Sequence, residues 1–225
     1  MAQAPATNTT SAEAKPNIER WIAGFLVFAF ASGALAHLLP AVREVTTYTT
    51  DVFLLLSNGL ILFALFQRHG DRRLWWWLIG AYLFTFAAEA AGVATGQIFG
   101  EYAYGSTMRW QYLGVPFVIA LNWVVLTLAA NQLVSERLNS PLAIALGAGI
   151  VLALYDVAIE PVAIELDYWQ WANGTIPLQN YLAWALVAAI ISWPLQHWKI
   201  RFSSPLLMVY FWAQLAFFIT LNLAL

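Results

Sequence analysis

Long apolar stretches separated by short polar segments dominate the pattern of the chain. Each stretch has about the length, roughly 17 to 25 residues, that a helix needs to cross the hydrocarbon core of a bilayer. The pattern therefore predicts an all-α fold, a polytopic transmembrane helical bundle. The seven expected spans are about 21–39, 51–66, 74–92, 115–134, 142–162, 178–198 and 205–225.

The composition agrees with this pattern. Of the residues, 61% are hydrophobic and only 10% are charged, whereas soluble domains carry roughly 25% charged residues. The 10 Lys and Arg residues form no dense run, which argues against nucleic-acid binding. The chain has no cysteine, which excludes disulfides and thiolate catalysis. The expected surroundings are therefore a lipid bilayer.

The polar, Ala- and Thr-rich start of the chain differs from the remainder. Residues 1–20 are expected to form a disordered tail. The connections between spans are too short for a second domain, so residues 21–225 are expected to be a single transmembrane domain. The motif "ALAH" has the small-x-small pattern of a signal-peptide cleavage site, but the apolar run before it is long enough to span.

Basic residues indicate the orientation. Lys and Arg concentrate in the tail and in alternate loops, and the other side holds only Arg43 and Arg109. Because positively charged loops are retained in the cytoplasm, the amino terminus is expected inside and the carboxyl terminus outside. The expected location is the cell membrane, as a multi-pass protein of a bacterial or archaeal inner membrane.

Polar residues within the spans gather at one depth. With the expected orientation they all fall in the outer leaflet, and the long outer loops 93–114 and 163–177 add aromatic residues. One end of the bundle should therefore form a polar and aromatic cavity. The polar residues at this depth are His37, Asp51, Glu89, Asn122, Asp156, Glu160 and Asn180, and the aromatic residues expected to line a cavity are Tyr102, Tyr104, Trp123, Trp169, Trp171 and Trp184.

The intramembrane acids are the strongest functional signal. A charged carboxylate near the bilayer core costs at least ~2.5 kcal/mol, so it is kept neutral, paired or next to a wet cavity. Asp156 and Glu160 are four residues apart and share a helix face. Two close carboxylates do not both ionise cheaply, so one of them can become a proton donor. Pro161 places Glu160 at an expected kink or helix end.

Other interpretations of these residues remain open. Asp156 or Glu160 can pair with Arg43 or Arg109 as a structural lock, and His37 can be an ordinary interfacial histidine. Glu165 and Asp167 are expected to be loop charges in water.

A metal site is not predicted. The histidines, at positions 37, 69 and 197, show no ligand spacing.

Gly92, Gly96 and Gly100 are spaced by four, as in a helix-packing ridge. The tyrosines and the further glycine that follow favour a backbone that turns closely under a ligand.

Four blocks of sequence together resemble a known family. They are "EAAGVATGQIFGEYAYG" (89–105), "GVPFVIALNW" (114–123), "YDVAIEPVAIELDYWQW" (155–171) and "IPLQNYLAW" (176–184). Their order and spacing are similar to those of the integral-membrane carotenoid-biosynthesis hydratases, which include bisanhydrobacterioruberin hydratase and carotenoid 1,2-hydratases. The resemblance implies a hydro-lyase that needs no cofactor and adds water across the terminal double bond of an acyclic carotenoid.

This chemistry fits the residues. A protonated carboxyl can protonate the alkene, a neighbouring carboxylate can take the proton of the attacking water, and aromatic faces can stabilise the tertiary cation. We expect Asp156 or Glu160 to be the proton donor, the other to be the base or orienting group, and Glu89 to be coupled to them. Asn122 and Asn180 would orient water or a carboxyl, and the aromatic residues named above would surround the cation.

Rival functions follow from the same residues. A carotenoid cyclase would use the same protonation, followed by capture of the cation by a second double bond. A proton-coupled transporter needs acids on a path to both sides, whereas the inner half is nearly free of them. A retinal protein needs a lysine in the last span, which has none. Beside the acyclic carotenoid, other enzymes of the same pathway are candidate partners.

Overall fold

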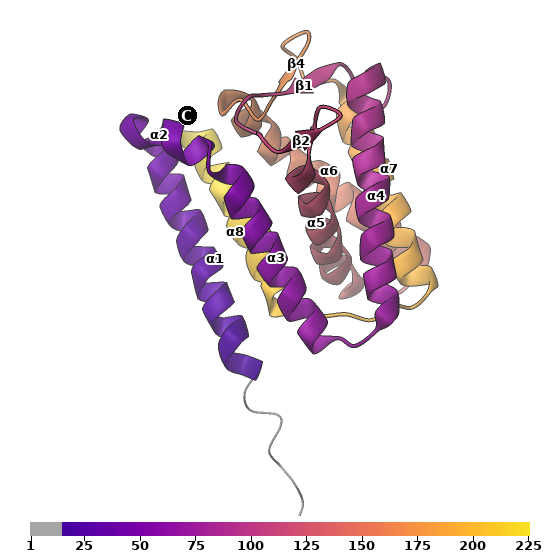
Figure 1. The fold of residues 1–225 in the computed structure, drawn as a ribbon. Helices are drawn as coiled ribbons and strands as arrows, with labels where there is room; N and C mark the ends of the chain where they lie inside the picture. Colours follow the sequence, from indigo (N-terminus) through magenta and orange to yellow (C-terminus); the bar gives the residue numbers. More distant parts are fainter. Residues whose placement is uncertain (1–14) are drawn as a thin grey trace, which may run out of the picture.

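A computed structural model describes residues 15–225 of the chain. In this part of the chain, eight helices are joined by short connections and by two longer segments with short strands (Figure 1). The helices are α1 (Lys15–Leu38), α2 (Pro40–Thr47), α3 (Thr50–Arg68), α4 (Arg72–Thr95), α5 (Phe117–Ser135), α6 (Pro141–Glu165), α7 (Leu178–His197) and α8 (Pro205–Ala224). The strands are β1 (Tyr102–Tyr104), β2 (Gln111–Tyr112), β3 (Val115–Pro116) and β4 (Trp169–Trp171).

All of these helices except α2 are long and apolar enough to cross a membrane, seven among the described residues. The predicted all-α polytopic bundle is thereby confirmed, and the chain is a multi-pass membrane protein. Helix α1 begins at Lys15, within the stretch expected to be a tail. The remainder of that tail, residues 1–14, lies outside the described residues. The short α2, which begins with Pro40 at its first turn, was not predicted.

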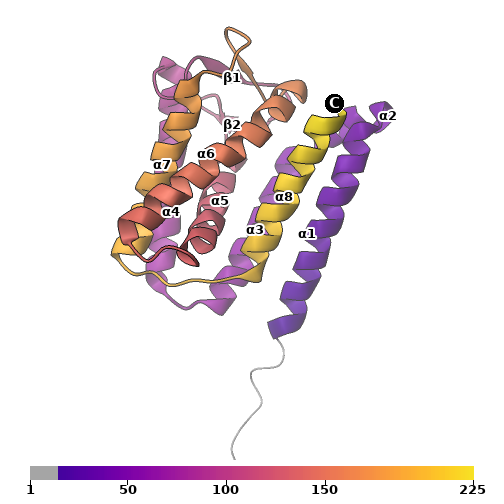
Figure 2. The same ribbon diagram turned by 180° about the vertical axis from the view of Figure 1, so that it is seen from behind.

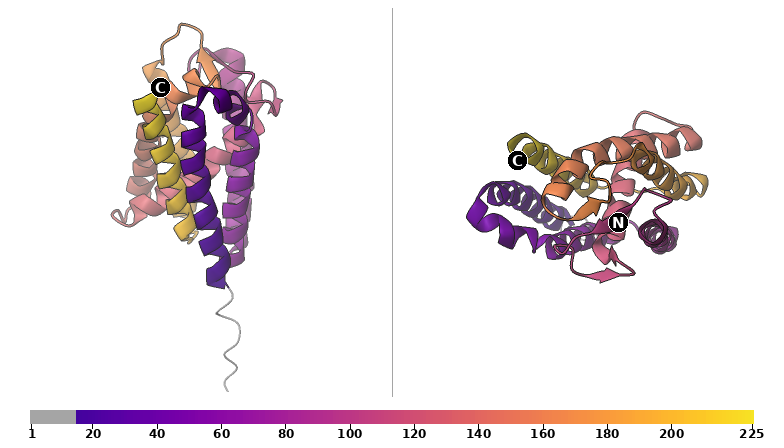
Figure 3. Two further views of the ribbon diagram at one scale, coloured as in Figure 1. Left: turned by 90° about the vertical axis from the view of Figure 1, so that its left-hand side faces the viewer. Right: turned by 90° about the horizontal axis from the view of Figure 1, so that it is seen from above.

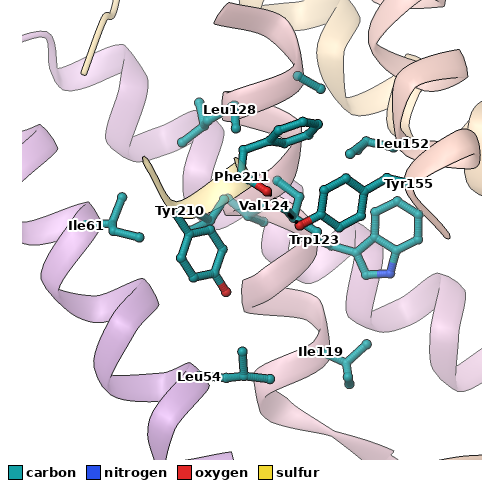
Figure 4. Close-up of a cluster of buried hydrophobic side chains, with 14 of the residues drawn as sticks. Leu54, Ile61, Ile119, Trp123, Val124, Leu128, Leu152, Tyr155, Tyr210 and Phe211 are labelled. Carbon is teal, nitrogen blue, oxygen red and sulfur yellow. Dashed lines mark hydrogen bonds between the residues drawn. The ribbon is translucent and has the colours of Figure 1, made fainter. Parts of the chain in front are cut away.

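Helix α5 lies at the centre of the bundle. It packs against α3, α4, α6, α7 and α8, while α1 lies at one edge beside α8 and α4 and α7 lie at the opposite edge (Figures 1 and 2). Trp123 and Val124 of α5 meet Tyr155 of α6 and Phe211 of α8 in the apolar core (Figure 4). A central helix surrounded on all sides explains why the α5 sequence is apolar around its whole circumference.

A two-stranded ribbon covers one end of the bundle. Strands β1 and β4 pair antiparallel, with Tyr102 opposite Trp171 and Tyr104 opposite Trp169. Because side chains alternate along a strand, these four aromatic residues share the face that is turned toward the helices, and the intervening Ala103 and Gln170 are exposed. Figure 3 shows the ribbon from the side and from above. We call this the ribbon end of the bundle; it also holds the carboxyl terminus.

Glycines let the chain fold back at the end of α4. Gly96 ends the helix at φ 66° and Gly100 has φ 111°, both in the region that favours glycine. A Cβ at Gly92 would lie 2.6 Å from Cδ2 of Phe99, so the returning segment packs directly on the helix. The packing-ridge interpretation is wrong, because Gly96 and Gly100 lie beyond the helix. The glycines instead allow a close backbone turn that brings β1 back over α4.

Helix α6 runs further than its sequence suggests. Pro161 lies inside the helix, which continues to Glu165. Of the two alternatives for Glu160, the helix end is therefore wrong, and the kink stays a prediction. Residues on either side of Pro161 remain on one continuous helix, and this keeps Asp156 and Glu160 on the same face, one turn apart.

Candidate functional site

A cavity of about 480 Å³ lies at the ribbon end, where all seven long helices contribute to its wall. This volume is within the usual range of small-molecule sites, about 300 to 1,000 Å³. Every residue proposed from the sequence as catalytic or substrate-binding lines it. These are Glu89, Tyr102, Tyr104, Asn122, Trp123, Asp156, Glu160, Trp169, Trp171, Asn180 and Trp184.

Glu160 is held by three donors. Its Oε2 accepts hydrogen bonds from Nε1 of Trp169 at 3.0 Å and Nε1 of Trp171 at 2.9 Å. Its Oε1 accepts one from Nδ2 of Asn180 at 2.8 Å. The two tryptophans reach it because they occupy alternate positions of β4, so the ribbon aims both indole N–H groups at one carboxylate. The Glu160 side chain is buried, and these three hydrogen bonds fix its position.

Glu89 of α4 is held in the same way by the other strand. Its Oε2 accepts from the hydroxyl of Tyr102 at 2.5 Å and from that of Tyr104 at 2.8 Å. Its Oε1 accepts from Nε1 of Trp123 at 3.3 Å. Burial, together with the neighbouring Glu89 carboxylate, raises the pKa of Tyr102 and of Tyr104 above the usual tyrosine value. Both hydroxyls therefore keep their protons and act as donors.

Asp156 has a different environment. It is as deeply buried as the two glutamates, but it accepts a single hydrogen bond, from Nδ2 of Asn180 to Oδ2 at 2.7 Å. Its Oδ1 has no hydrogen-bond partner within residues 15–225. Asn180 bridges Asp156 and Glu160 through the same amide nitrogen. Of the three carboxyl groups in the cavity, Asp156 has an oxygen left for a ligand.

The structural-lock interpretation of these acids is contradicted. Arg43 lies 3.8 Å from Glu165 and donates to the backbone oxygen of His37. Arg109 donates through its backbone N–H to Oδ2 of Asp51 at 2.7 Å. Among the described ion pairs, none involves a carboxylate of the cavity. The cavity acids are held by neutral donors.

Aromatic faces surround the acids. The indole rings of Trp123 and Trp184 are stacked with an interplanar angle of 17°. Phe99 lies beside Trp184, with ring centroids 6.0 Å apart, and edge-on to Tyr102 at 6.1 Å. Ring faces attract a cation that comes within about 6 Å. The cavity therefore combines carboxyl groups with several such faces in an otherwise apolar wall.

A polar network at the cavity wall was largely missed by the sequence reasoning. Oδ1 of Asn122 accepts from the hydroxyl of Tyr210 at 2.6 Å and from Nε2 of Gln214 at 3.4 Å. Oε1 of Gln214 accepts in turn from the hydroxyl of Tyr155 at 3.1 Å. Only Asn122 was predicted. Gln214 is one of the few polar residues of the final span, and this was the signal that could have identified it.

His37 is buried on the cavity wall rather than placed at an interface with water. Its side chain is 4% exposed, and Nδ1 lies 2.8 Å from the backbone oxygen of Gly33. Because a carbonyl only accepts, Nδ1 carries the proton. Its Nε2 has no hydrogen-bond partner in the described part of the chain. The ring packs edge-on against Phe217, with centroids 5.5 Å apart.

No group of three or more His, Cys, Asp or Glu side chains suited to holding a metal ion occurs among residues 15–225.

No solved structure matches the chain. Bisanhydrobacterioruberin hydratase of Haloarcula japonica is 30% identical over 128 residues, which cover 53% of this chain and 44% of that protein, so the match spans less than half of the relative. A family model described as "Carotenoid biosynthesis protein" matches residues 49–225, which include every residue of the acid, amide and aromatic cluster. The chain belongs to this carotenoid biosynthesis protein family.

Proposed function

We propose that this protein is a carotenoid hydratase that adds water across the terminal double bond of an acyclic carotenoid end group. The observation that carries the proposal is the contrast between Asp156, which accepts one hydrogen bond, and its neighbour Glu160, which accepts three. The name of the haloarchaeal relative supports the same activity.

The first step is protonation of the alkene. Hydrogen bonds to a carboxylate favour its charged form, whereas burial disfavours it. Asp156 accepts a hydrogen bond from one donor, whereas Glu89 and Glu160 each accept three. Its charged form is therefore stabilised least by hydrogen bonds, and its Oδ1 accepts none from the described part of the protein. We assign it as the acid: its proton forms a C–H bond with the less substituted carbon, and the π electrons of the double bond supply that bond. The adjacent carbon becomes a tertiary cation.

The second step is capture of the cation by water. The water oxygen forms the C–O bond, and one water proton passes to the Asp156 carboxylate, which restores the acid. The product is a tertiary alcohol, and no oxidant or reductant is consumed. Glu160, fixed by its donors, orients Asp156 through Asn180 and lies near the developing positive charge. Stacked Trp123 and Trp184 and the other ring faces stabilise the cation.

Water capture distinguishes this proposal from cyclisation. A cyclase must keep water from the cation, whereas the wall of this cavity carries the amide of Asn122. Since Oδ1 of Asn122 is occupied by Tyr210, its NH₂ group is left to hold a water oxygen. This observation favours hydration over ring closure, which is the second candidate function.

The site is proposed to face the outside of the cell membrane. Arg68 and Arg73 form ion pairs with Glu19 and Asp71 at the end of the bundle opposite the ribbon. That end carries most of the basic residues, which by the positive-inside rule are cytoplasmic.

Expression in a bacterium that makes lycopene tests the function. Pigments are separated by chromatography and their masses are compared with those of a host that carries an empty vector. A new pigment heavier than its precursor by one water molecule is the expected result. A new pigment of unchanged mass would identify the cyclase, and unaltered acyclic pigments across several such hosts would reject both assignments.

A further inference from the structure

The cavity extends beyond the acids to one face of α1. Phe25, Phe28, Ala29, Ser32 and Ala36 all line it. Their spacings of three and four residues place them on one face of the helix. Phe30 also lines the cavity, but it lies on the adjoining, buried face of α1, where its ring is 5.6 Å from that of Tyr210. We call these five residues the α1 wall.

The α1 wall lies at an opening. Phe28 is 72% exposed and Phe25 is 37% exposed, although both line the cavity. A side chain that borders a cavity and the outside surface at once marks its mouth. On the other side of this mouth stands α3, which contributes Thr50 and Phe53 to the lining.

The packing of α1 explains the opening. Helix α1 lies along α8, and its contact with α3 is much slighter. Phe30 meets Phe53 of α3, with ring centroids 4.9 Å apart, and Phe217 of α8 at 6.0 Å. Figure 1 shows α1 at the edge of the bundle, with α3 and α8 between it and the remaining helices. A gap between α1 and α3 therefore remains beside this aromatic cluster.

The mouth lies within the depth of the hydrocarbon. Phe25, Phe28 and Ala29 belong to the apolar span Ile18–Leu38. At 1.5 Å per residue, the twelve-residue separation from Phe25 to His37 corresponds to about 18 Å along the helix. The opening therefore faces lipid chains, and the cavity rises from it toward His37 at the ribbon end.

We propose that the gap between α1 and α3 is a lateral portal, through which the polyene chain of an acyclic carotenoid passes from the bilayer to the acids. This inference rests on the proposed function. Continuity identifies the occupant, because one cavity joins the α1 wall to Asp156 and Glu160. A long, water-insoluble hydrocarbon with its end group at the acids must leave the cavity through an apolar mouth, and the α1 wall supplies one. The α1 wall lies before residue 49, so it is outside the part of the chain that the family model matches.

Paired tryptophan substitutions test the portal. Ala29 lines the cavity, whereas Ala31 is exposed and lies on the opposite face of the same turn. Ala29→Trp should obstruct the portal, and Ala31→Trp adds the same ring on the lipid-facing side. We expect Ala29→Trp to lower hydration by about tenfold or more relative to Ala31→Trp, the factor that corresponds to 1.4 kcal/mol of overpacking against the occupant. If Ala29→Trp fails to accumulate in the membrane, Ser32→Trp takes its place.

A binding measurement separates the portal from the reaction. In an Asp156→Asn background, the pigment that copurifies with the protein is measured by its absorbance. Ala29→Trp should reduce it by about the same factor, and Ala31→Trp should not. The portal would be overturned if the two tryptophan variants retained equal amounts of pigment and hydrated it equally. It would also be overturned if Ala29→Trp lost copurifying phospholipid and kept its pigment. If the wild type hydrates nothing but Ala29→Trp still reduces bound pigment, the proposed function fails and the portal stands.

Discussion

Tyr102 lies opposite Trp171 across the β1–β4 ribbon, yet the two side chains donate to different carboxylates. The hydroxyl of Tyr102 binds Glu89 at 2.5 Å and Nε1 of Trp171 binds Glu160 at 2.9 Å, with the two rings 5.2 Å apart. One short ribbon thus fixes acids from α4 and α6. The positions of both carboxylates depend on the pairing of two loops that are far apart in the sequence.

The donors of the ribbon should contribute measurably to stability. Trp171→Phe keeps an aromatic ring but removes one of the two indole donors to Oε2 of Glu160. Loss of a donor to a buried charged group costs about 1 to 3 kcal/mol, so thermal unfolding of the purified protein in detergent should occur at a lower temperature. Trp110→Phe, at an exposed position, is the matched control. Equal unfolding temperatures for the two variants would show that the hydrogen bond is not stabilising.

Replacing the proposed acid should remove activity without removing the protein. Asp156→Asn keeps the size of the side chain and leaves nothing acidic to protonate the alkene. General acid catalysis typically contributes about 10²- to 10⁴-fold, so hydration should fall by at least about 100-fold. Glu165→Gln changes a carboxylate on the same helix whose side chain is 56% exposed, and should leave hydration unchanged. Full activity of Asp156→Asn would assign the proton to another group.

Glycine should be required where the segment that returns from α4 packs against Pro177, the residue before α7. Gly100 has φ 111°, and a Cβ there would lie 2.6 Å from Cγ of Pro177. Gly174 also has a positive φ, 64°, but nothing lies within 4 Å of its added Cβ. Alanine strains the backbone at both positions, by about 1 kcal/mol or more, and adds a clash only at Gly100. Gly100→Ala should therefore lower the unfolding temperature further than Gly174→Ala; the reverse order would contradict this account of the turn.

The location of the site was predictable because of where polar groups can exist in a membrane. A carboxylate or an amide inside a span must face a cavity or a partner, so the depth of Glu89, Asp156 and Asn180 within their spans already indicated a common location. Hydropathy predicted the spans because each backbone polar group in lipid must form its hydrogen bond within its own helix, so a long apolar stretch must be helical.

The ribbon could not be predicted by that argument. Tyr102–Tyr104 and Trp169–Trp171 lie in separate loops, and their pairing depends on the positions of α4 and α6. The alternation of "YAY" and "WQW" is compatible with strands of period two, but three residues are too few to decide.

Helix α6 also continues through Pro161, because packing of its flanks outweighs the local preference of one residue. Tertiary contacts therefore decided both features.

The amide of Asn122 should determine the fate of the cation. With Oδ1 of Asn122 bound to Tyr210 at 2.6 Å, its NH₂ group is the donor available to hold the attacking water. Asn122→Leu removes that donor but leaves Asp156 able to protonate the alkene. The cation should then lose a proton or close a ring, so products of unchanged mass should increase at the expense of the alcohol, as measured by chromatography and mass. Asn222→Leu is the control, because Asn222 donates to the backbone oxygen of Ala158 and does not line the cavity. An unchanged product ratio in Asn122→Leu would show that the water is held elsewhere, and a proportional loss of all products would show that Asn122 acts before the cation forms.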